Sequence, residues 1–542
     1  MPQYLNISGK IIRTYSPDGF TRIDIIDREY EYVYKVVPIK LSNEEQLILK
    51  RVMDELSYIL KPSELTSAEK MEEVLRKRGL SDKLVYLIKS EIVGYSWLEP
   101  LMRDDNLEDI QCFHANVPLR VTHKDYGLIQ TNIIPSDDEV DRMVRILAHR
   151  GGSGIHRSRP ILDSVILPTG DRAALTYRSE VSPTSSFTIR KFPRYPWTPT
   201  RMMLTHMISP EAMALLWLAI EAKLPIIIFG EMGSGKTSLA NALGCLIKPT
   251  ASITLVQDVP EMRIPHENLI SLSERKSFTV GSVGEIKLDS LVAHALRRST
   301  DYLIVNEVRY AEARAFAQHV ATGHGGITSF HAGSLNEVYS RFKELGIEES
   351  TMSSVKVLIQ TIKVTSPLRG SFSIARRVKS IFYITGLRNY VPIADIVFDY
   401  DPAKDTLTPL NIRSTLEEVS RRLLVDMNSL LKEYEQRKIF MTLALEAARY
   451  GKYLRAEEWF ILLRKYYHSP KNVLNELRAH IHEIKTNKVK ASINYKTCPK
   501  CNSRVDINKD TCPSCGYDFV NEKTTFNNLG KGVSRSMEGL RR

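Results

Sequence analysis

The stretch PIIIFGEMGSGKT, Pro225 to Thr237, decides the fold. Its apolar residues have the composition of a short buried strand, and the letters that follow, SLANALGCLI, favour a helix. Between them, Gly230 to Thr237 match the pattern G-x-x-x-x-G-K-[ST] in the strand-to-helix context that this motif requires. The stretch therefore predicts a phosphate-binding loop on the sheet of an α/β domain.

Each residue type in this loop has a chemical reason to be there. Glycines let backbone N–H groups turn toward phosphate oxygens, and the N-terminal end of the following helix favours anions. We expect Lys236 to reach the β- and γ-phosphates and the Thr237 hydroxyl to ligate Mg²⁺. ATP and Mg²⁺ are therefore the expected substrate and cofactor. The expected binding residues are Gly230, Glu231, Met232, Gly233, Ser234, Gly235, Lys236, Thr237 and Ser238.

Two more apolar runs end in acidic residues. DYLIVNE is a predicted strand that ends at Glu307, which we expect to be the general base for hydrolysis. ITLVQD is another; it ends at Asp258, and a second carboxylate, Glu261, follows closely. Apolar strands separated by helices indicate a parallel sheet covered on both faces.

The rest of the chain divides by composition. PRYPWTPT has three prolines in eight residues and is expected to be an irregular linker. Ser209 with Pro210 predicts one helix start, Ser42 another, and Ser414 with Glu417 a capping box. The expected domains are an N-terminal strand and helical region at 1–94, a small α+β domain at 95–192, the linker at 193–205, the ATPase domain at 206–412, a helical extension at 413–490, a zinc ribbon at 495–520 and a disordered basic tail at 521–542.

Charge is concentrated at the C-terminal end. The 542 residues carry a formal net charge of +12, and from Lys485 onward 12 Lys and Arg face 5 Asp and Glu, a net +7. The first 484 residues are thus close to balanced, so we do not expect nucleic acid as a partner. No apolar run approaches the roughly 18 residues of a spanning helix, and MPQYLNISGK lacks the apolar core of a signal peptide. We expect a cytoplasmic protein.

Four of the six cysteines form the pattern CPKCNSRVDINKDTCPSCG. Two C-x₂-C pairs offer four thiolates, the ligand set of a tetrahedral structural zinc site, and disulfides are disfavoured in the cytosol. The predicted zinc ligands are Cys498, Cys501, Cys512 and Cys515. The remaining two, Cys112 and Cys245, lie among apolar residues and are expected to be buried.

The segment TGHGGITSFHAGS places His324 and His331 seven residues apart. No third metal ligand lies nearby, and the flanking glycines suit close backbone approach more than ligand fixation. Either histidine alone would be read as a polar residue of a surface loop. Their place in the order of motifs along the chain changes that interpretation.

Four boxes occur in the order found in the type II/type IV secretion ATPase family, which the chain resembles over roughly residues 95 to 400. They are the Walker A loop, an Asp box VQDVPE, a Walker B box IVNEVRYAEA and a His box TGHGGITSFHAGS. The phrase IPHENLI is similar to the LPHEN of archaeal members. The resemblance implies a RecA-like ATPase domain after a sensor-like α+β domain, in a hexameric ring.

The resemblance also implies residue roles. It adds Arg309 in the Walker B box to the catalytic candidates, and it places His324 and His331 near the nucleotide or a subunit interface. Arg172 and Arg190 stand where the family has N-domain arginines that approach the phosphates. The sequence departs from the family at Gln257, Asn306 and Tyr310, so hydrolysis is expected to depend on Glu307 or to be slow.

The expected function is an ATP-driven motor for a type IV pilus-like filament or for secretion. Its expected partners are copies of itself and a polytopic membrane platform protein, at the inner face of the cytoplasmic membrane. Two alternatives stay open. The P-loop, zinc ribbon and basic tail also suit a nucleic-acid translocating ATPase, and Gln257 with Asn306 suits a non-hydrolysing assembly platform.

Overall fold

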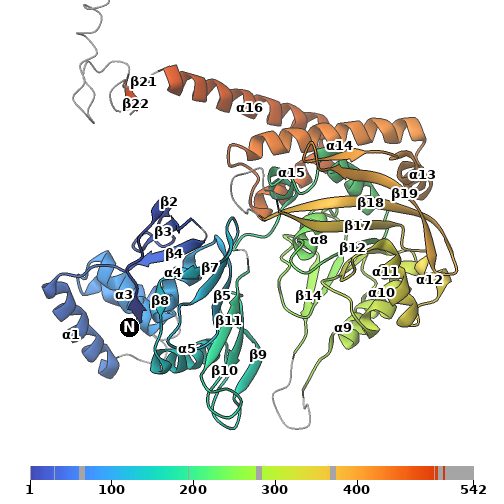
Figure 1. The fold of residues 1–542 in the computed structure, drawn as a ribbon. Helices are drawn as coiled ribbons and strands as arrows, with labels where there is room; N and C mark the ends of the chain where they lie inside the picture. The colour runs from blue at the N-terminus through green and yellow to red at the C-terminus, as the bar shows by residue number, and fades with distance from the viewer. Residues whose placement is uncertain are drawn as a thin grey trace, which may run out of the picture.

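The computed structural model describes residues 2–29, 31–59, 68–192, 194–275, 284–365, 374–493, 495–497 and 504–506. Figure 1 shows two bodies joined by a single connection, with the N-terminal elements on one side and the sheet of the phosphate-binding loop on the other. The cysteines of the predicted zinc ribbon, and the predicted basic tail, lie outside the described residues.

The N-terminal body is built on a mixed sheet with the strand order β2-β3-β4-β7-β6-β5-β11-β10-β9, in which only the β4–β7 pair is parallel. Its strands are β2 (Lys10–Tyr15), β3 (Arg22–Asp27), β4 (Tyr32–Val37), β5 (Leu107–Cys112), β6 (Arg120–His123), β7 (Gly127–Thr131), β9 (Ile161–Ile166), β10 (Arg172–Thr176) and β11 (Ser186–Arg190). The strands β1 (Gln3–Tyr4) and β8 (Ile133–Ile134) pair separately.

Helices complete this body. The helices α1 (Asn43–Ile59), α2 (Ala68–Lys77) and α3 (Asp82–Ile92) share a small core of their own. The other helical elements are η1 (Ser96–Leu98), α4 (Glu99–Arg103) and α5 (Asp137–Arg150). Apolar residues of η1, α4 and α5 pack with those of the sheet in one larger core. The start of α1 is as predicted, because Ser42 and Glu45 exchange the two hydrogen bonds of a capping box.

The second body contains the predicted parallel sheet. Its strand order is β14-β13-β15-β16-β12-β17-β18-β19-β20, parallel from β14 to β17 and antiparallel from β17 onward. The strands are β12 (Ile226–Gly230), β13 (Ile253–Gln257), β14 (Leu269–Ser273), β15 (Tyr302–Val305), β16 (Gly325–Phe330), β17 (Val357–Thr365), β18 (Ile374–Arg388), β19 (Val391–Asp401) and β20 (Thr406–Pro409). The expected α/β fold is therefore confirmed.

Both faces of this sheet are buried. Along β12, Ile226 and Ile228 belong to the core on one face, and Ile227 and Phe229 to the core on the other. Helices on the first face include α7 (Pro210–Glu221) and α8 (Lys236–Gly244). On the second face lie α9 (Leu288–Ala295), η2 (Leu296–Arg298), α10 (Ala311–Ala321), α11 (Leu335–Glu344) and α12 (Glu349–Met352). This two-sided burial explains why the strands are apolar throughout.

The C-terminal helices share the core of the parallel sheet in the second body. They are α13 (Arg413–Leu423), α14 (Met427–Ala448), α15 (Ala456–His468) and α16 (Pro470–Ile493). Trp217 of α7 contacts Phe440 and Tyr466, and Trp459 donates a hydrogen bond of 3.0 Å from its indole N–H to the Cys245 carbonyl. Figure 1 shows α14 and α15 against one side of the sheet, so these helices are part of its covering layer.

Two local predictions need correction. The proline-rich linker contains a short helix, α6 (Pro199–Leu204), because the Thr198 hydroxyl caps it and proline is tolerated in a first turn. Helix α13 begins at Arg413 instead of using Ser414 as its cap, and Glu417 pairs with Arg413. The predicted start of α7 at Ser209 and Pro210 is confirmed, since the serine accepts a hydrogen bond from Ala212.

No helix in the described part of the chain is long and apolar enough to cross a membrane. The short strands β21 (Tyr495–Thr497) and β22 (Arg504–Asp506) pair beyond the end of α16.

Candidate nucleotide site

The phosphate-binding loop connects β12 to α8 at the carboxyl edge of the parallel sheet. Gly233 and Gly235 have φ of +72° and +95°, a region that side chains strongly disfavour. A Cβ on Gly230 would lie 2.3 Å from the Thr361 carbonyl oxygen on β17. The glycines of the motif are therefore required by the backbone path, and Gly235 leads directly into the first turn of α8.

Lys236 is the buried cation of this loop. Its Nζ donates to the Gly230 and Glu231 carbonyls at 3.0 and 2.9 Å, and it lies 3.2 Å from Nδ1 of His331. Burial lowers the pKa of this ammonium to about 8, partly opposed by the negative charge of Glu307. The lysine thus gains from any additional anion at the loop, which is what a phosphate supplies.

His331 links the lysine to the predicted base. It follows β16, and its Nε2 lies 2.8 Å from Oε1 of Glu307, which follows β15. Burial first, and the Lys236 charge second, lower the pKa of His331, so the imidazole is neutral at neutral pH. With Nδ1 facing an ammonium, the ring proton belongs on Nε2, toward the carboxylate.

Glu307 is held from one side. Its Oε2 forms an ion pair with Arg309, and the carboxylate is 14% exposed. The contact of Oε1 with His331 has the distance but not the direction of a hydrogen bond, so among the described residues this buried oxygen has no hydrogen-bond partner. A carboxylate oxygen in that condition is available to accept a proton from a water molecule.

The Asp box contributes a second group of acidic residues. Asp258 accepts hydrogen bonds from the Val259 N–H at 2.8 Å and the Asn306 amide at 3.3 Å. The pKa of Glu261 is raised, chiefly by burial, while Arg190 acts in the opposite direction. Gln257 is buried and accepts a hydrogen bond of 2.7 Å from the Met262 N–H, so it shapes the loop and does not face the site.

The N-domain arginines face the same place. Arg172 on β10 and Arg190 on β11 are directly opposite one another in the antiparallel pair. Both lower the pKa of Glu261, and Arg190 also lowers that of Lys236, although burial is the larger influence on each. The structure therefore brings the charges of both arginines to the acidic group from the other body.

His324 lies elsewhere. It precedes β16, whereas His331 follows it, so the two are separated by the strand, roughly 20 Å. Its ring stacks on His319 of α10 with centroids 4.6 Å apart, and its Nδ1 lies 2.9 Å from the Thr322 hydroxyl. Since β12 and β16 are parallel, His324 is at the edge of the sheet opposite the phosphate-binding loop. Of the two predicted places for His324, the structure does not put it near the nucleotide loop of its own subunit, and a place at a subunit interface stays a prediction.

The remaining loop residues have different surroundings. Met232 is 68% exposed, and the Ser234 hydroxyl is committed to Glu231 and Thr361. Thr237 and Ser238 lie in the first turn of α8 and are partly exposed. The Thr237 hydroxyl, with the carboxylates of Asp258 and Glu307 at the ends of neighbouring strands, is a donor set that suits Mg²⁺. Among the residues that the structure describes, no group of three or more His, Cys, Asp or Glu side chains is placed to hold a metal ion.

Sequence reasoning missed two basic residues. Lys363 on β17 approaches Gly233 so closely that a Cβ there would lie 3.0 Å from its Nζ. Arg376 on β18 donates from Nε to the Gly233 carbonyl at 2.8 Å and pairs through Nη2 with Glu108 of the N-terminal body, also at 2.8 Å. Nothing in the sequence indicated them, because their roles depend on β17 lying beside β12.

Comparison with known proteins gives a consistent result. The family model described as "Type II/IV secretion system protein" matches residues 167–371. Two uncharacterized proteins of Methanocaldococcus jannaschii are 35% and 34% identical to this chain, over 62% and 45% of it and 61% and 90% of their own lengths. The type IV secretion system protein PtlH of Bordetella pertussis is 29% identical over 42% of this chain and 76% of its own.

The chain spans less than two thirds of the first of these relatives. The matched segment contains the phosphate-binding loop, the Asp box, Glu307 and His331, which are the residues that the structure gathers at one edge of the sheet. On this agreement of segment and site, the chain belongs to the type II/IV secretion system protein family.

Proposed function

We propose that this protein is an ATP-hydrolysing motor that powers the assembly of a type IV pilus-like filament, or secretion, across the cytoplasmic membrane. The observation that carries the hydrolytic part is the chain of contacts from Lys236 through His331 to the buried carboxylate of Glu307. Membership of the family supports the part that concerns filaments and secretion.

Substrate binding would begin at Lys236. A triphosphate in the loop offers oxygens that replace the Gly230 and Glu231 carbonyls as acceptors for Nζ. Burial lowers the pKa of this ammonium, and the negative charge of the bound triphosphate would stabilise its charged form. Because His331 contacts the same Nζ, movement of the lysine changes the surroundings of the histidine.

Hydrolysis would depend on Glu307. Its Oε1, which accepts no hydrogen bond from the described residues, would accept the proton of the attacking water. The ion pair with Arg309 holds Oε2, and the His331 ring lies 2.8 Å from Oε1. The Thr237 hydroxyl would help to hold Mg²⁺, which would supply charge stabilisation at the phosphate oxygens. Arg190 and Arg172 approach from the N-terminal body and would stabilise the charge that develops on the transferred phosphoryl group.

Gln257 does not argue against an active enzyme in this proposal. It is occupied with the backbone of the Asp box, a role that needs no carboxylate. The carboxylates available at this edge of the sheet for proton transfer and metal binding are those of Glu307, Asp258 and Glu261. We accordingly favour hydrolysis over a non-hydrolysing platform.

We extend the proposal to the assembly. The protein would act as a homo-hexamer, bound peripherally at the inner face of the cytoplasmic membrane to a polytopic platform protein. Nucleic acid is not proposed as a substrate, since the first 484 residues carry only +5 of the net charge. A structural zinc on the four C-terminal cysteines is part of the same proposal.

The hydrolytic part is tested by ATP turnover of the full chain with Mg²⁺. Glu307→Gln should lower kcat by roughly 10²- to 10⁴-fold, the range typical of a lost general base. Glu344→Gln is the matched control, because this glutamate is exposed at the end of α11. Equal turnover in Glu307→Gln and the unchanged protein would contradict the proposal and favour a nucleotide-dependent platform.

The cellular part is tested by deleting the gene and imaging the cell surface, together with secretion assays. A missing filament type or a lost secreted protein is expected. Intact filaments and secretion, combined with turnover that DNA stimulates, would point to a nucleic-acid motor instead.

A further inference from the structure

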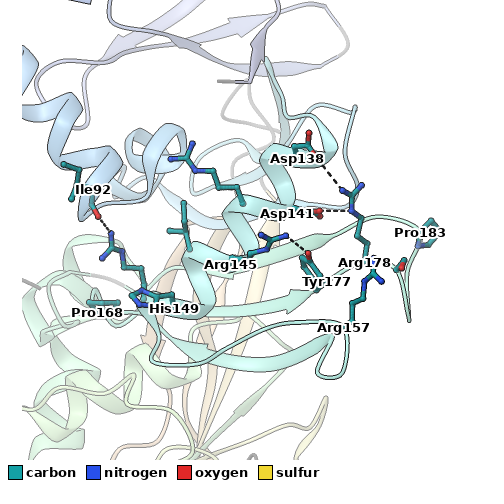
Figure 2. Close-up of a pocket in the computed structure, with 14 residues that line it drawn as sticks. Ile92, Asp138, Asp141, Arg145, His149, Arg157, Pro168, Tyr177, Arg178 and Pro183 are labelled. Atoms are coloured by element: carbon teal, nitrogen blue, oxygen red, sulfur yellow. Dashed lines mark hydrogen bonds and ion pairs between the residues drawn. The ribbon is translucent and has the colours of Figure 1, made fainter. Parts of the chain in front are cut away.

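A cavity lies in the N-terminal body, lined by residues other than those of the phosphate-binding loop. Its volume is about 1300 Å³, and its wall comes from α5, the end of α3 and the residues that follow β9 and β10. Drug-sized ligands occupy clefts of about 300–1000 Å³, so this one accommodates a small organic molecule with water. Figure 2 shows its residues.

Cations dominate the wall. Five arginines line it, against two aspartates. Figure 2 shows both aspartates beside Arg178, which pairs with Asp141 at 2.7 Å and Asp138 at 3.5 Å. Arg142 pairs with Glu91 at 3.0 Å. The other three, Arg145, Arg150 and Arg157, form no ion pair with any described carboxylate.

These three arginines differ in how they are held. Arg145 donates to the Tyr177 hydroxyl at 2.5 Å, and its guanidinium carbon lies 5.2 Å from the centre of that ring. Arg150 donates to the Ile92 carbonyl at 2.6 Å, but its Nε is buried and has no hydrogen-bond partner among the described residues. Arg157 is exposed at the rim.

A desolvated guanidinium without an anion is costly. Burial lowers the pKa of Arg150, and Tyr95 and the Glu99 carboxylate oppose this shift only in part. A fold keeps such a group where a ligand supplies the counter-charge, and guanidinium groups bind phosphate oxygens in bidentate fashion. Arg145 and Arg157 are exposed and form no ion pair among the described residues, so with Arg150 three guanidinium groups at this cavity match a ligand with several negative charges.

The remaining residues that line the cavity indicate what the uncharged part of the ligand would be. Ile92, Pro168 and Pro183 are apolar, and the ring of Tyr177 is held in place by Arg145. An apolar or planar group would pack against them. We propose that this cavity binds a soluble phosphate ester that carries two or more phosphate groups, of the nucleotide class, at a site distinct from the phosphate-binding loop.

The position of the cavity connects it with the nucleotide site. Tyr177 directly follows β10, and Arg172 begins the same strand. A ligand that orders the Tyr177 end of β10 therefore acts on the strand that carries one of the arginines facing Glu261. This connection requires no contact between the two ligands.

The test uses the full chain with Lys236→Ala, so that binding in the phosphate-binding loop is removed from the measurement. Inorganic tripolyphosphate is titrated by isothermal calorimetry. We expect saturable binding that becomes at least about tenfold weaker, which is a loss of roughly one charge-assisted contact, when Arg145→Gln and Arg150→Gln are added. Arg120→Gln is the matched control, since Arg120 is exposed on β6 of the same body and does not line the cavity.

One further variant and one further probe complete the test. Arg157→Gln, at an exposed rim position, should weaken binding several-fold without disturbing the fold. Absence of binding in the Lys236→Ala chain, or equal affinity with and without the cavity arginines, would overturn the proposal. So would a failure to bind tripolyphosphate combined with arginine-dependent binding to phosphatidylglycerol vesicles, because the ligand would then be a lipid headgroup.

Discussion

At the scale of single residues, His331 is the side chain whose role the structure sharpens most. Its neutral ring lies between the ammonium of Lys236 and the carboxylate of Glu307 and contacts both groups. His324 has the same residue type and belongs to the same sequence box, yet it stacks on His319 at the other end of β16. Substituting His331 and His324 separately therefore tests which of the two histidines acts at the nucleotide site.

His331→Ala should lower ATP turnover about ten- to a hundredfold, less than the loss expected for the base itself, because it removes the group that positions Glu307. ATP affinity should change by no more than about twofold, since Lys236 keeps its loop acceptors. Turnover and fluorescent-nucleotide binding measure the two effects. His324→Ala should leave both unchanged, and equal losses in the two variants would reject a specific role for His331.

Another residue prediction concerns His319. Burial first, and His324 second, lower its pKa to about 4. The unfolded chain binds this proton near pH 6.5, so the folded state is favoured fully above that pH and loses stability as the pH falls toward 4. Between pH 7 and 5 the loss is about 2 kcal/mol.

Thermal melting at both pH values measures the effect. His319→Gln should reduce the drop in Tm between pH 7 and pH 5, whereas the exposed control His482→Gln should not. An identical drop in all three proteins would show that protonation of His319 is not coupled to folding.

At the scale of elements, the sequence predicted the central strands well and the covering layer poorly. The apolar runs at β12, β13 and β15 are unambiguous because both of their faces are buried. The short helix α6 was missed because three prolines suggested irregular chain, although Pro199 sits where a helix accepts it. Helices α13 to α16 gave an amphipathic pattern, but pattern alone did not say which surface they cover.

Strand β18 provides the element-scale prediction. Arg376 joins Gly233 of the phosphate-binding loop to Glu108 of β5 in the other body. Arg376→Gln should therefore raise the KM for ATP about three- to tenfold, equivalent to roughly 1 kcal/mol for a lost charge-assisted hydrogen bond, and should increase proteolysis of the connection between the bodies.

The matched control lies on the same strand. Arg388 is exposed at the end of β18, so Arg388→Gln should change neither quantity. If Arg376→Gln behaves like Arg388→Gln in both assays, the contact does not couple the loop to the N-terminal body.

At the scale of the whole molecule, the resemblance read from four short boxes led to the correct family and to the correct edge of the sheet for Glu307 and His331. It could not predict the contributions of Lys363 and Arg376, since these depend on the strand order beside β12. The arginine-lined cavity could not be predicted from the sequence either, because its residues are spread from Ile92 to Pro183 and come together only in the fold.

The zinc ribbon remains a prediction at this scale. Purified protein should contain stoichiometric zinc by mass spectrometry, and Cys498→Ser with Cys501→Ser should lose it, since half of the four thiolates are removed. ATP turnover should persist, because the proposed nucleotide site lies in the second body and not at the four cysteines. Zinc content equal in both proteins would contradict the assignment of these cysteines.

The last helix has a mechanical consequence. Helix α16 is about 36 Å long. Its buried apolar residues Val473, Leu474, Leu477 and Ile481 lie in its first half, and Lys485 in its second half pairs with Glu446 of α14. Figure 1 shows its far end pointing away from the sheet. In a helix of this length, a tilt of about 10° at its base would move its tip by about 6 Å. Small shifts of the helices packed around Trp217 would thus be larger at the C-terminal end of α16.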